Sequence, residues 1–174
     1  IMLKTIEGLK YIQSNHDYDY VLRTNLSTFL HIDNFLKILE YLDTLNSNEI
    51  YAGPLMINHE MKHKFISGTS MIYSRDSIKN NLLENYNTLD LTPYSDDFEL
   101  GKLYKKKITD LTKYYDKLVY LSDYDYDKNE YNFSDDDKKN LVKNIIEKDL
   151  YIFRSKNYDR QFDVNLMEYL TNSF

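Results

Sequence analysis

Two adjacent aspartates, Asp96 and Asp97, stand in a segment that could hold an anion beside a substrate. The segment runs from Ser95 to Gly101 and reads Ser-Asp-Asp-Phe-Glu-Leu-Gly. Ser95 is a typical N-cap residue, so both aspartates are expected in the first turn of a helix, where the helix dipole stabilises negative charge. A carboxylate held there can act as a general base towards a hydroxyl group. Acids in a first turn can also serve only to stabilise the helix, and the segment alone fits both interpretations.

A second polar segment, residues 23–28, lies at the end of an apolar stretch that is predicted to be a strand. Open α/β sheets bind ligands at the carboxyl ends of their strands. Arg23, Thr24, Asn25 and Ser27 are therefore candidate substrate-binding residues. The same residues would also suit a turn that leads into the next helix, and the sequence leaves that alternative open.

A third candidate segment is Ser67-Gly68-Thr69, which precedes another predicted strand. Small residues there let the backbone approach a ligand closely, so all three are candidate substrate-binding residues, although a plain turn has the same composition. His59 and His63 are spaced like two ligands on one helix face. No third ligand accompanies them, so we predict no metal site at this pair.

Composition narrows the classes of function. The chain has 174 residues, with 22 basic and 28 acidic side chains and a net charge of −6. Proteins that bind nucleic acid need a basic face, so we expect no nucleic-acid partner. The absence of cysteine excludes disulfides, thiol catalysis and zinc–thiolate sites in this chain. No stretch approaches the roughly 20 apolar residues of a membrane-spanning helix, so no membrane span is expected.

A secretory signal consists of a charged, an apolar and a small-residue stretch at the start of a chain. No charged, apolar and small-residue pattern stands there, so a cytoplasmic location is expected. The chain is rich in tyrosine, asparagine, lysine and isoleucine, a composition typical of AT-rich genomes. This favours a viral or bacterial source, and hence a bacterial cell or a virus-infected host.

The elements that must position these residues follow from hydrophobic periodicity. Apolar residues at helical spacing predict helices at the start of the chain, over about residues 32–45, after Ser74, after Ser134 and over residues 162–170. Ser134 and Asp137 together form a capping-box pattern. Short β-branched and aromatic stretches predict strands at residues 18–24, 50–54, 71–73, 117–121 and 150–153. The alternation predicts an α/β fold in which one mixed sheet is flanked by helices, within a single domain over residues 1–174. The acidic stretch 122–132 is expected to be a surface loop.

These segments, in this order, resemble the β-1,3-galactosyltransferase and Fringe-like glycosyltransferases. Residues 19–24 look like the strand that leads into the family's metal motif. Residues 67–74, Ser-Gly-Thr-Ser-Met-Ile-Tyr-Ser, resemble its glycine-rich segment, and residues 96–101 are similar to its acidic Glu-Asp-Val-x-x-Gly signature. The resemblance covers roughly residues 3 to 105, with a looser match in the tail.

The resemblance implies a GT-A-like fold that lacks the family's N-terminal nucleotide-binding part. It implies transfer of a hexose from a nucleotide-sugar to a hydroxyl group of a glycan acceptor, with inversion. Asp97 matches the family's catalytic base, and Asp96 lies beside it as a substrate-binding residue. The alternative is a non-catalytic carbohydrate-binding or interaction module derived from such an enzyme.

One departure from the family concerns its metal. The family holds Mn²⁺ or Mg²⁺ with an aspartate-rich triplet, and Asn25-Leu26-Ser27 stands at that place here. Hard divalent cations prefer anionic oxygen ligands, and this segment carries no charge. The sequence therefore predicts that Mn²⁺ binds only weakly at residues 25–27.

Overall fold

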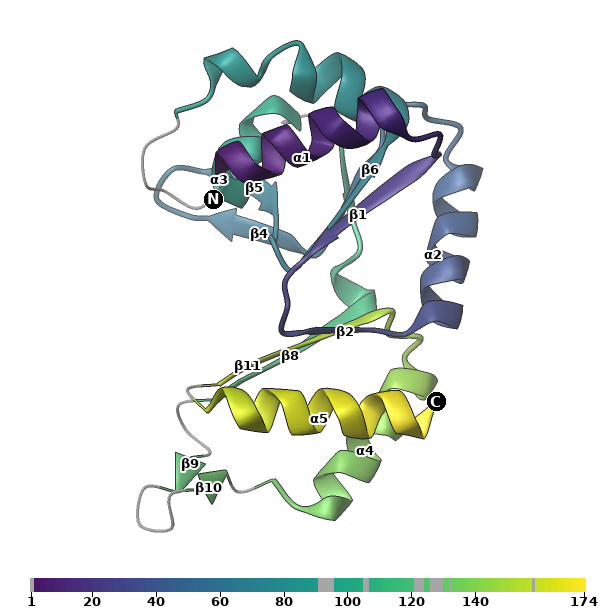
Figure 1. The fold of residues 1–174 in the computed structure, drawn as a ribbon, viewed down its shortest axis with the longest axis vertical. Helices are drawn as coiled ribbons and strands as arrows, with labels where there is room; N and C mark the ends of the chain where they lie inside the picture. Colours follow the sequence, from purple (N-terminus) through teal and green to yellow (C-terminus); the bar gives the residue numbers. More distant parts are fainter. Residues whose placement is uncertain are drawn as a thin grey trace. The chain divides into compact units, whose positions relative to one another are not determined.

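The computed structural model describes residues 2–90, 96–104, 107–120, 124–125, 130–131, 133–157 and 159–174 (Figure 1). The chain divides into two compact units. Unit 1 comprises Ile1–Thr24 and Leu42–Thr112, and unit 2 comprises Asn25–Tyr41 and Lys113–Phe174. Each unit is described by itself below.

The sheet of unit 1 is mixed. Its strands, in spatial order, are β1 (Tyr20–Thr24), β6 (Ser70–Ser74), β3 (Tyr51–Gly53) and β7 (Ile108–Asp110). β6 runs antiparallel to β1 and β3, and β7 runs parallel to β3. The prediction that the strands around Val21, Ala52 and Ile72 share one mixed sheet is therefore confirmed. The strands predicted at residues 117–121 and 150–153 do not join it and lie in a separate sheet of unit 2.

One edge of this sheet collects the polar segments of unit 1. The carboxyl ends of β1, β3 and β7 meet there, together with the start of β6, since Thr24 pairs with Ser70 and Gly53 with Asp110. Gly53 has a φ of 152°, and a Cβ on it would lie 2.1 Å from the Ser70 carbonyl oxygen. This position therefore accepts only glycine without a shift of the backbone.

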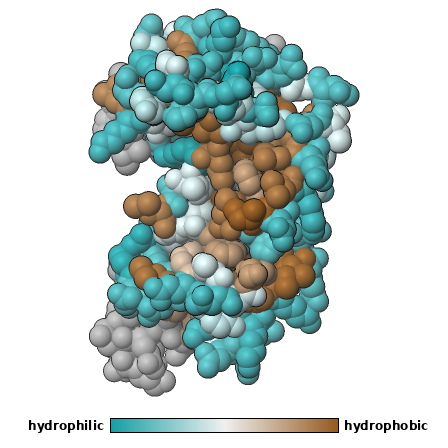
Figure 2. All heavy atoms as spheres, turned by 45° about the vertical axis from the view of Figure 1, so that its right-hand side comes forward, coloured by the Kyte–Doolittle hydropathy of each residue, from teal (hydrophilic) through white to brown (hydrophobic). Residues whose placement is uncertain are grey.

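Helices cover the sheet of unit 1. α1 (Met2–Asn15) buries Met2, Ile6 and Leu9, the apolar positions expected from the sequence, against a core that includes Met71 and Tyr73 of β6. Its outward positions include Lys4 and Glu7 as well as the exposed Leu3 and Tyr11, and hydrophilic residues dominate the surface at the top of Figure 2. The periodicity thus places α1 correctly with its apolar side inward.

The helix expected after Ser74 differs in its winding. The segment Ser77–Leu83 (η1) is a π-helix that buries Ile78 and Leu82, and the short 3₁₀ turn η2 (Tyr86–Thr88) follows. The Ser74 hydroxyl oxygen accepts a hydrogen bond from the Ser77 N–H at 3.3 Å, while Asp76 holds the N-cap position of η1 and makes no capping bond with its side chain. Two apolar residues four positions apart fit an α-helix and a π-helix alike, and the sequence could not separate them.

A hairpin that the sequence analysis missed lies beside the acidic helix. Its strands are β4 (Leu55–Asn58) and β5 (His63–Ile66), paired antiparallel. The helix α3 (Asp96–Gly101) packs on β5, where the Phe65 and Phe98 rings meet edge to face with centroids 5.6 Å apart. The 3₁₀ turn η3 (Lys102–Tyr104) continues α3. The helix starts at the two aspartates as predicted, while Ser95 lies outside the described residues.

Three tyrosines fill the centre of unit 1. Tyr51, Tyr73 and Tyr104 are buried, and the Tyr51 ring stacks on Tyr104 at 4.1 Å and on Tyr73 at 5.2 Å between centroids. Burial raises the pKa of all three phenols above the ordinary range. They remain neutral and act as core.

Unit 2 has a three-stranded sheet with β11 (Ile152–Asn157) between β2 (Thr28–Leu30) and β8 (Tyr115–Tyr120). β11 runs antiparallel to β2 and parallel to β8. The helices α4 (Asp135–Glu147) and α5 (Arg160–Ser173) pack on the Phe153 side of the sheet. The remaining elements of this part of the chain are α2 (Ile32–Thr44), whose last turn belongs to unit 1, η4 (Thr112–Tyr114), β9 (Tyr124–Asp125) and β10 (Glu130–Tyr131).

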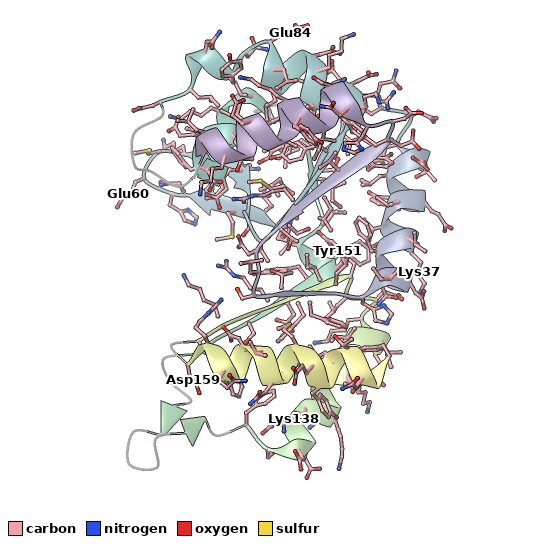
Figure 3. All side chains as sticks on the ribbon, viewed as in Figure 1. Lys37, Glu60, Glu84, Lys138, Tyr151 and Asp159 are labelled. Atoms are coloured by element: carbon pink, nitrogen blue, oxygen red, sulfur yellow. The ribbon has the colours of Figure 1, made fainter. Side chains whose placement is uncertain are left out.

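Local sequence signals account for most of unit 2. The capping box of Ser134 and Asp137 forms at the start of α4, as predicted. Tyr151 is buried and points towards α2, where the Phe35 ring stacks on it with centroids 6.0 Å apart (Figure 3). Apart from β9 and β10, the loop expected over residues 122–132 lies outside the described residues.

The described residues thus form an α/β structure with mixed sheets flanked by helices. None of its described helices is long and apolar enough to cross a membrane. That the chain is one domain, and that it is GT-A-like and incomplete, stay predictions.

Candidate functional site

A cluster of polar groups forms at the edge of the unit 1 sheet. We call it the edge cluster and define it by Arg23, Gly68, Asp96 and Asp97. These residues come from the end of β1, the turn before β6 and the start of α3. All four were sequence candidates, and the fold brings them into contact across up to 73 residues of chain.

Arg23 is the centre of the edge cluster. Its guanidinium donates from Nη2 to Asp96 Oδ2 at 2.6 Å and from Nη1 to the Gly68 carbonyl oxygen at 2.9 Å. The side chains of Arg23 and Asp96 are only 19% and 12% exposed, so the ion pair is largely removed from water. The Thr5 hydroxyl of α1 adds a 3.3 Å hydrogen bond to Asp96 Oδ2. Arg23 and Asp96 therefore bind each other.

Asp97 is held by two backbone N–H groups. Its Oδ2 accepts from the Gly68 N–H at 2.9 Å, and its Oδ1 accepts from the Phe98 N–H at 3.0 Å. An ionised carboxylate has about four acceptor positions, so each oxygen keeps a second one as far as the described residues are concerned. The side chain is half-buried. Asp97 is thus fixed in orientation and can still accept a hydrogen bond from a hydroxyl group.

Gly68 allows this arrangement because it has no side chain. A Cβ on residue 68 would lie 2.5 Å from Arg23 Nη1 and 3.3 Å from Asp97 Oδ2. The sequence suggested close approach of a ligand at this glycine. In the structure the groups that approach it are Arg23 and Asp97 of the chain itself.

The other candidates of unit 1 stabilise the turn that carries Gly68. The Thr24 hydroxyl donates to the Thr69 carbonyl oxygen at 2.8 Å, which ties the turn to β1. The Ser67 hydroxyl donates to Thr69 Oγ1 at 3.0 Å and accepts from the Thr69 N–H at 3.3 Å. Ser67 and Thr69 are buried. These contacts fit the turn interpretation that the sequence left open.

Asp110 is a carboxylate at the same sheet edge that the sequence analysis did not single out. It ends β7, opposite Gly53, and its side chain is exposed. Its Oδ1 accepts from the Thr112 N–H at 2.8 Å and from the Thr112 hydroxyl at 2.5 Å. The signal that could have identified it is the short strand pattern Ile108-Thr109 ending in an acid.

Asn25 and Ser27 belong to unit 2. Ser27 is 7% exposed, and its carbonyl oxygen accepts from the Ser155 N–H at 3.0 Å. Leu26, between them, is fully exposed. A pocket of about 360 Å³ lies between this turn and α5, lined among others by Ser27, Arg160 and Met167. Its neighbour of about 500 Å³ is lined by β2, Met167 and Phe174.

The turn at residues 25–27 does not fit a divalent cation. Its side chains offer one amide oxygen and one hydroxyl oxygen and no carboxylate, and one of its three carbonyl oxygens is used by Ser155. Within the described ranges, no three His, Asp or Glu side chains come together in a way that could hold a metal ion. We therefore derive no step that runs through a cation at this turn.

A buried carboxylate that was not among the sequence candidates, Asp163, lies at the start of α5. Asp163 is 3% exposed and accepts from the Ser155 hydroxyl at 2.6 Å, Asn157 Nδ2 at 2.7 Å and Arg160 Nη1 at 2.6 Å. These bonds join α5 to β11. The signal in the sequence is a serine and an asparagine two residues apart on a strand, followed by an acid in the first helical turn.

Neither a protein-family model nor a curated protein sequence matches this chain. The assignment of a function therefore depends on the geometry of the edge cluster.

Proposed function

We propose that this chain is a glycosyltransferase-like domain that transfers a hexose from a nucleotide-sugar to a hydroxyl group of a glycan acceptor, with inversion. One observation carries the proposal. The carboxylate of Asp97 is oriented by N–H groups of two separate segments, at the sheet edge where β1, β3 and β7 end, and it keeps acceptor positions. Sheet edges of this kind are where α/β proteins bind substrates.

The chemistry needs one base. As the acceptor oxygen attacks the anomeric carbon, its proton passes to a carboxylate oxygen of Asp97. The bond between the anomeric carbon and the diphosphate oxygen breaks, and the nucleoside diphosphate leaves with the electron pair. Attack from the face opposite the leaving group inverts the configuration. A positioned general base contributes typically about 10²–10⁴-fold to such a step.

A GT-A-like architecture is part of the proposal. It is supported by a mixed sheet in which an acidic helix start meets a glycine turn, in the order of segments that the sequence resemblance gave. Since the turn at residues 25–27 carries no carboxylate, the proposed mechanism assigns it no metal.

A non-catalytic carbohydrate-binding module is the second candidate. The observation that favours it is the internal bonding of the edge cluster: Arg23 and Asp96 are occupied by each other, and Asp97 by two N–H groups. A cluster built only to stabilise α3 would show the same contacts. The two candidates predict different results for turnover and the same result for sugar binding.

The test combines transfer and binding. The chain is incubated with UDP- and GDP-hexoses and a set of glycan acceptors, with and without Mn²⁺, and product configuration is read by proton NMR of the anomeric signal. We expect an inverted product from the wild type and none from Asp97→Asn. Saturation-transfer NMR with the same sugars detects binding. Binding without turnover would favour the second candidate, and a retained configuration would overturn the proposed mechanism.

A further inference from the structure

We infer that Arg23 is a positioning residue: it holds the turn at Gly68 so that the Gly68 N–H orients Asp97, and it does not itself bind a substrate. The inference rests on the proposed function in assigning Asp97 a catalytic role. The contacts that support it lie wholly within unit 1.

The guanidinium of Arg23 is already occupied. Nη2 binds Asp96, and Nη1 binds the Gly68 carbonyl oxygen and lies 3.8 Å from the sulfur of Met71. That sulfur in turn accepts from the buried Tyr73 hydroxyl at 3.0 Å. The planar guanidinium has donors in a rigid fork, so binding two partners fixes its plane as well as its position. A substrate would have to displace one of these partners.

Gly68 transmits the position of Arg23 to Asp97. Its carbonyl oxygen accepts from Arg23, and its N–H donates to Asp97 Oδ2. The two groups flank the same α-carbon, and glycine rotates more freely there than any other residue. The hydrogen bond from Arg23 restrains this rotation on the carbonyl side, which keeps the N–H directed at the carboxylate.

The two oxygens of Asp97 depend on different parts of the chain. Oδ1 is held by the N–H of the next residue, Phe98, within α3. Oδ2 is held by Gly68, which is 29 residues away in sequence. Loosening the turn should therefore affect the contact at Oδ2 and leave the contact at Oδ1. This difference separates positioning by Arg23 from a general loss of structure.

A lysine at position 23 would not hold the turn at Gly68 as Arg23 does. Its ammonium is a compact point charge, which can pair with Asp96 but does not present the fork that also reaches the Gly68 carbonyl oxygen. Arg23→Lys therefore keeps the charge and removes the bridge. A second variant, Arg23→Met with Asp96→Asn, removes both charges so that no buried charge is left unpaired.

The test follows two backbone amides by NMR. In the ¹⁵N-labelled protein with Arg23 in place, the Gly68 and Phe98 amide signals should both shift when Asp97→Asn removes the carboxylate that they bind. In Arg23→Lys and in the double variant, we expect the Gly68 response to fall to less than half while the Phe98 response persists. Arg75→Met is the matched control, because Arg75 pairs with Asp17 and does not touch the turn. A Gly68 response equal to that of the wild type in both Arg23 variants would overturn the inference.

Kinetics distinguish positioning from substrate binding. Misplacing the base should lower kcat of Arg23→Lys, by roughly ten- to a hundredfold, and change KM little. A substrate-binding arginine would instead raise KM, and that result would overturn the inference. If the wild type transfers no sugar, the proposed function fails, but the amide experiment still decides whether Arg23 positions Asp97.

Discussion

Gly68 and Arg23 lie so close that a Cβ on residue 68 would stand 2.5 Å from the guanidinium nitrogen Nη1. The contact joins the turn before β6 to the end of β1, and it leaves the Gly68 N–H free to bind Asp97. A side chain at residue 68 would therefore displace the Arg23 guanidinium from its present position.

Replacing Gly68 with alanine should disrupt that contact. We expect Gly68→Ala to lower the free energy of unfolding by about 1–3 kcal/mol, because the added methyl group overpacks the turn and displaces Arg23. Urea unfolding measures the change. Gly8→Ala is the control: nothing lies within 4 Å of a Cβ there, and alanine in the middle of α1 should raise stability by about 0.5–1 kcal/mol. Equal behaviour of the two variants would contradict the packing seen at Gly68.

The two neighbouring aspartates should behave differently in turnover. If the chain transfers sugar, Asp97→Asn should lower kcat by about 10²–10⁴-fold with little change in KM, since an amide cannot accept the proton. Asp96→Asn should lower kcat less, because Asp96 is the partner of Arg23 and not the proposed base. Steady-state kinetics and thermal melting are measured on both variants. Equal and small kinetic effects would remove the catalytic assignment of Asp97.

The buried carboxylate of Asp163 should matter for stability. Asp163→Ala removes the acceptor of the buried Ser155 hydroxyl and one of the two acceptors of the Asn157 side-chain amide, which keeps only Ser155 Oγ. Unsatisfied buried groups cost about 1–3 kcal/mol, so we expect a loss of at least about 2 kcal/mol by urea unfolding. Asp159→Ala is the control, since the Asp159 side chain caps α5 by accepting from the Gln161 N–H, and loss of this cap should cost about 1 kcal/mol. A smaller effect at Asp163 than at Asp159 would contradict the bonding described.

The capping box of α4 should make a pH-dependent contribution. Hydrogen bonds from the Ser134 hydroxyl and backbone N–H hold the pKa of Asp137 below its ordinary value of 3.8. A lowered pKa in the folded state stabilises the fold above the ordinary value, and this contribution is lost as the pH falls through the lowered one. Ser134→Ala should therefore destabilise the protein clearly at pH 7 and less below pH 3.8. Melting curves of the wild type and Ser134→Ala at several pH values measure this effect. A difference in stability between the two proteins that grew on acidification would contradict it.

Mn²⁺ should bind weakly at the turn of Asn25-Leu26-Ser27. Neutral amide and hydroxyl oxygens do not offset the cost of dehydrating a small divalent cation, so we expect a Kd of about 1 mM or weaker. Isothermal calorimetry measures it. A micromolar site that disappears in Asn25→Ala would show that the turn is a metal site after all.

Local patterns determined the helices and the central strands. Apolar residues at helical spacing predict α1, α2, α4 and α5. This spacing places the apolar residues on one side of each helix, and that side becomes buried regardless of which element it packs against. β1, β3 and β6 follow from short aromatic and β-branched stretches. The hairpin β4–β5 was missed because the adjacent Met56 and Ile57 of β4 are both exposed, so the strand lacks the alternation of apolar and polar residues that is typical of a half-buried sheet.

The sequence by itself determined which side chains are available for chemistry: two aspartates at a helix start, a glycine turn and an arginine that ends a strand. Only the tertiary structure decided how they pair. Arg23 binds Asp96, and Gly68 joins Arg23 to Asp97, over separations of 73, 45 and 29 residues. Such contacts depend on the order of strands in the sheet and on where α3 packs, and these follow from long-range burial that no local pattern encodes.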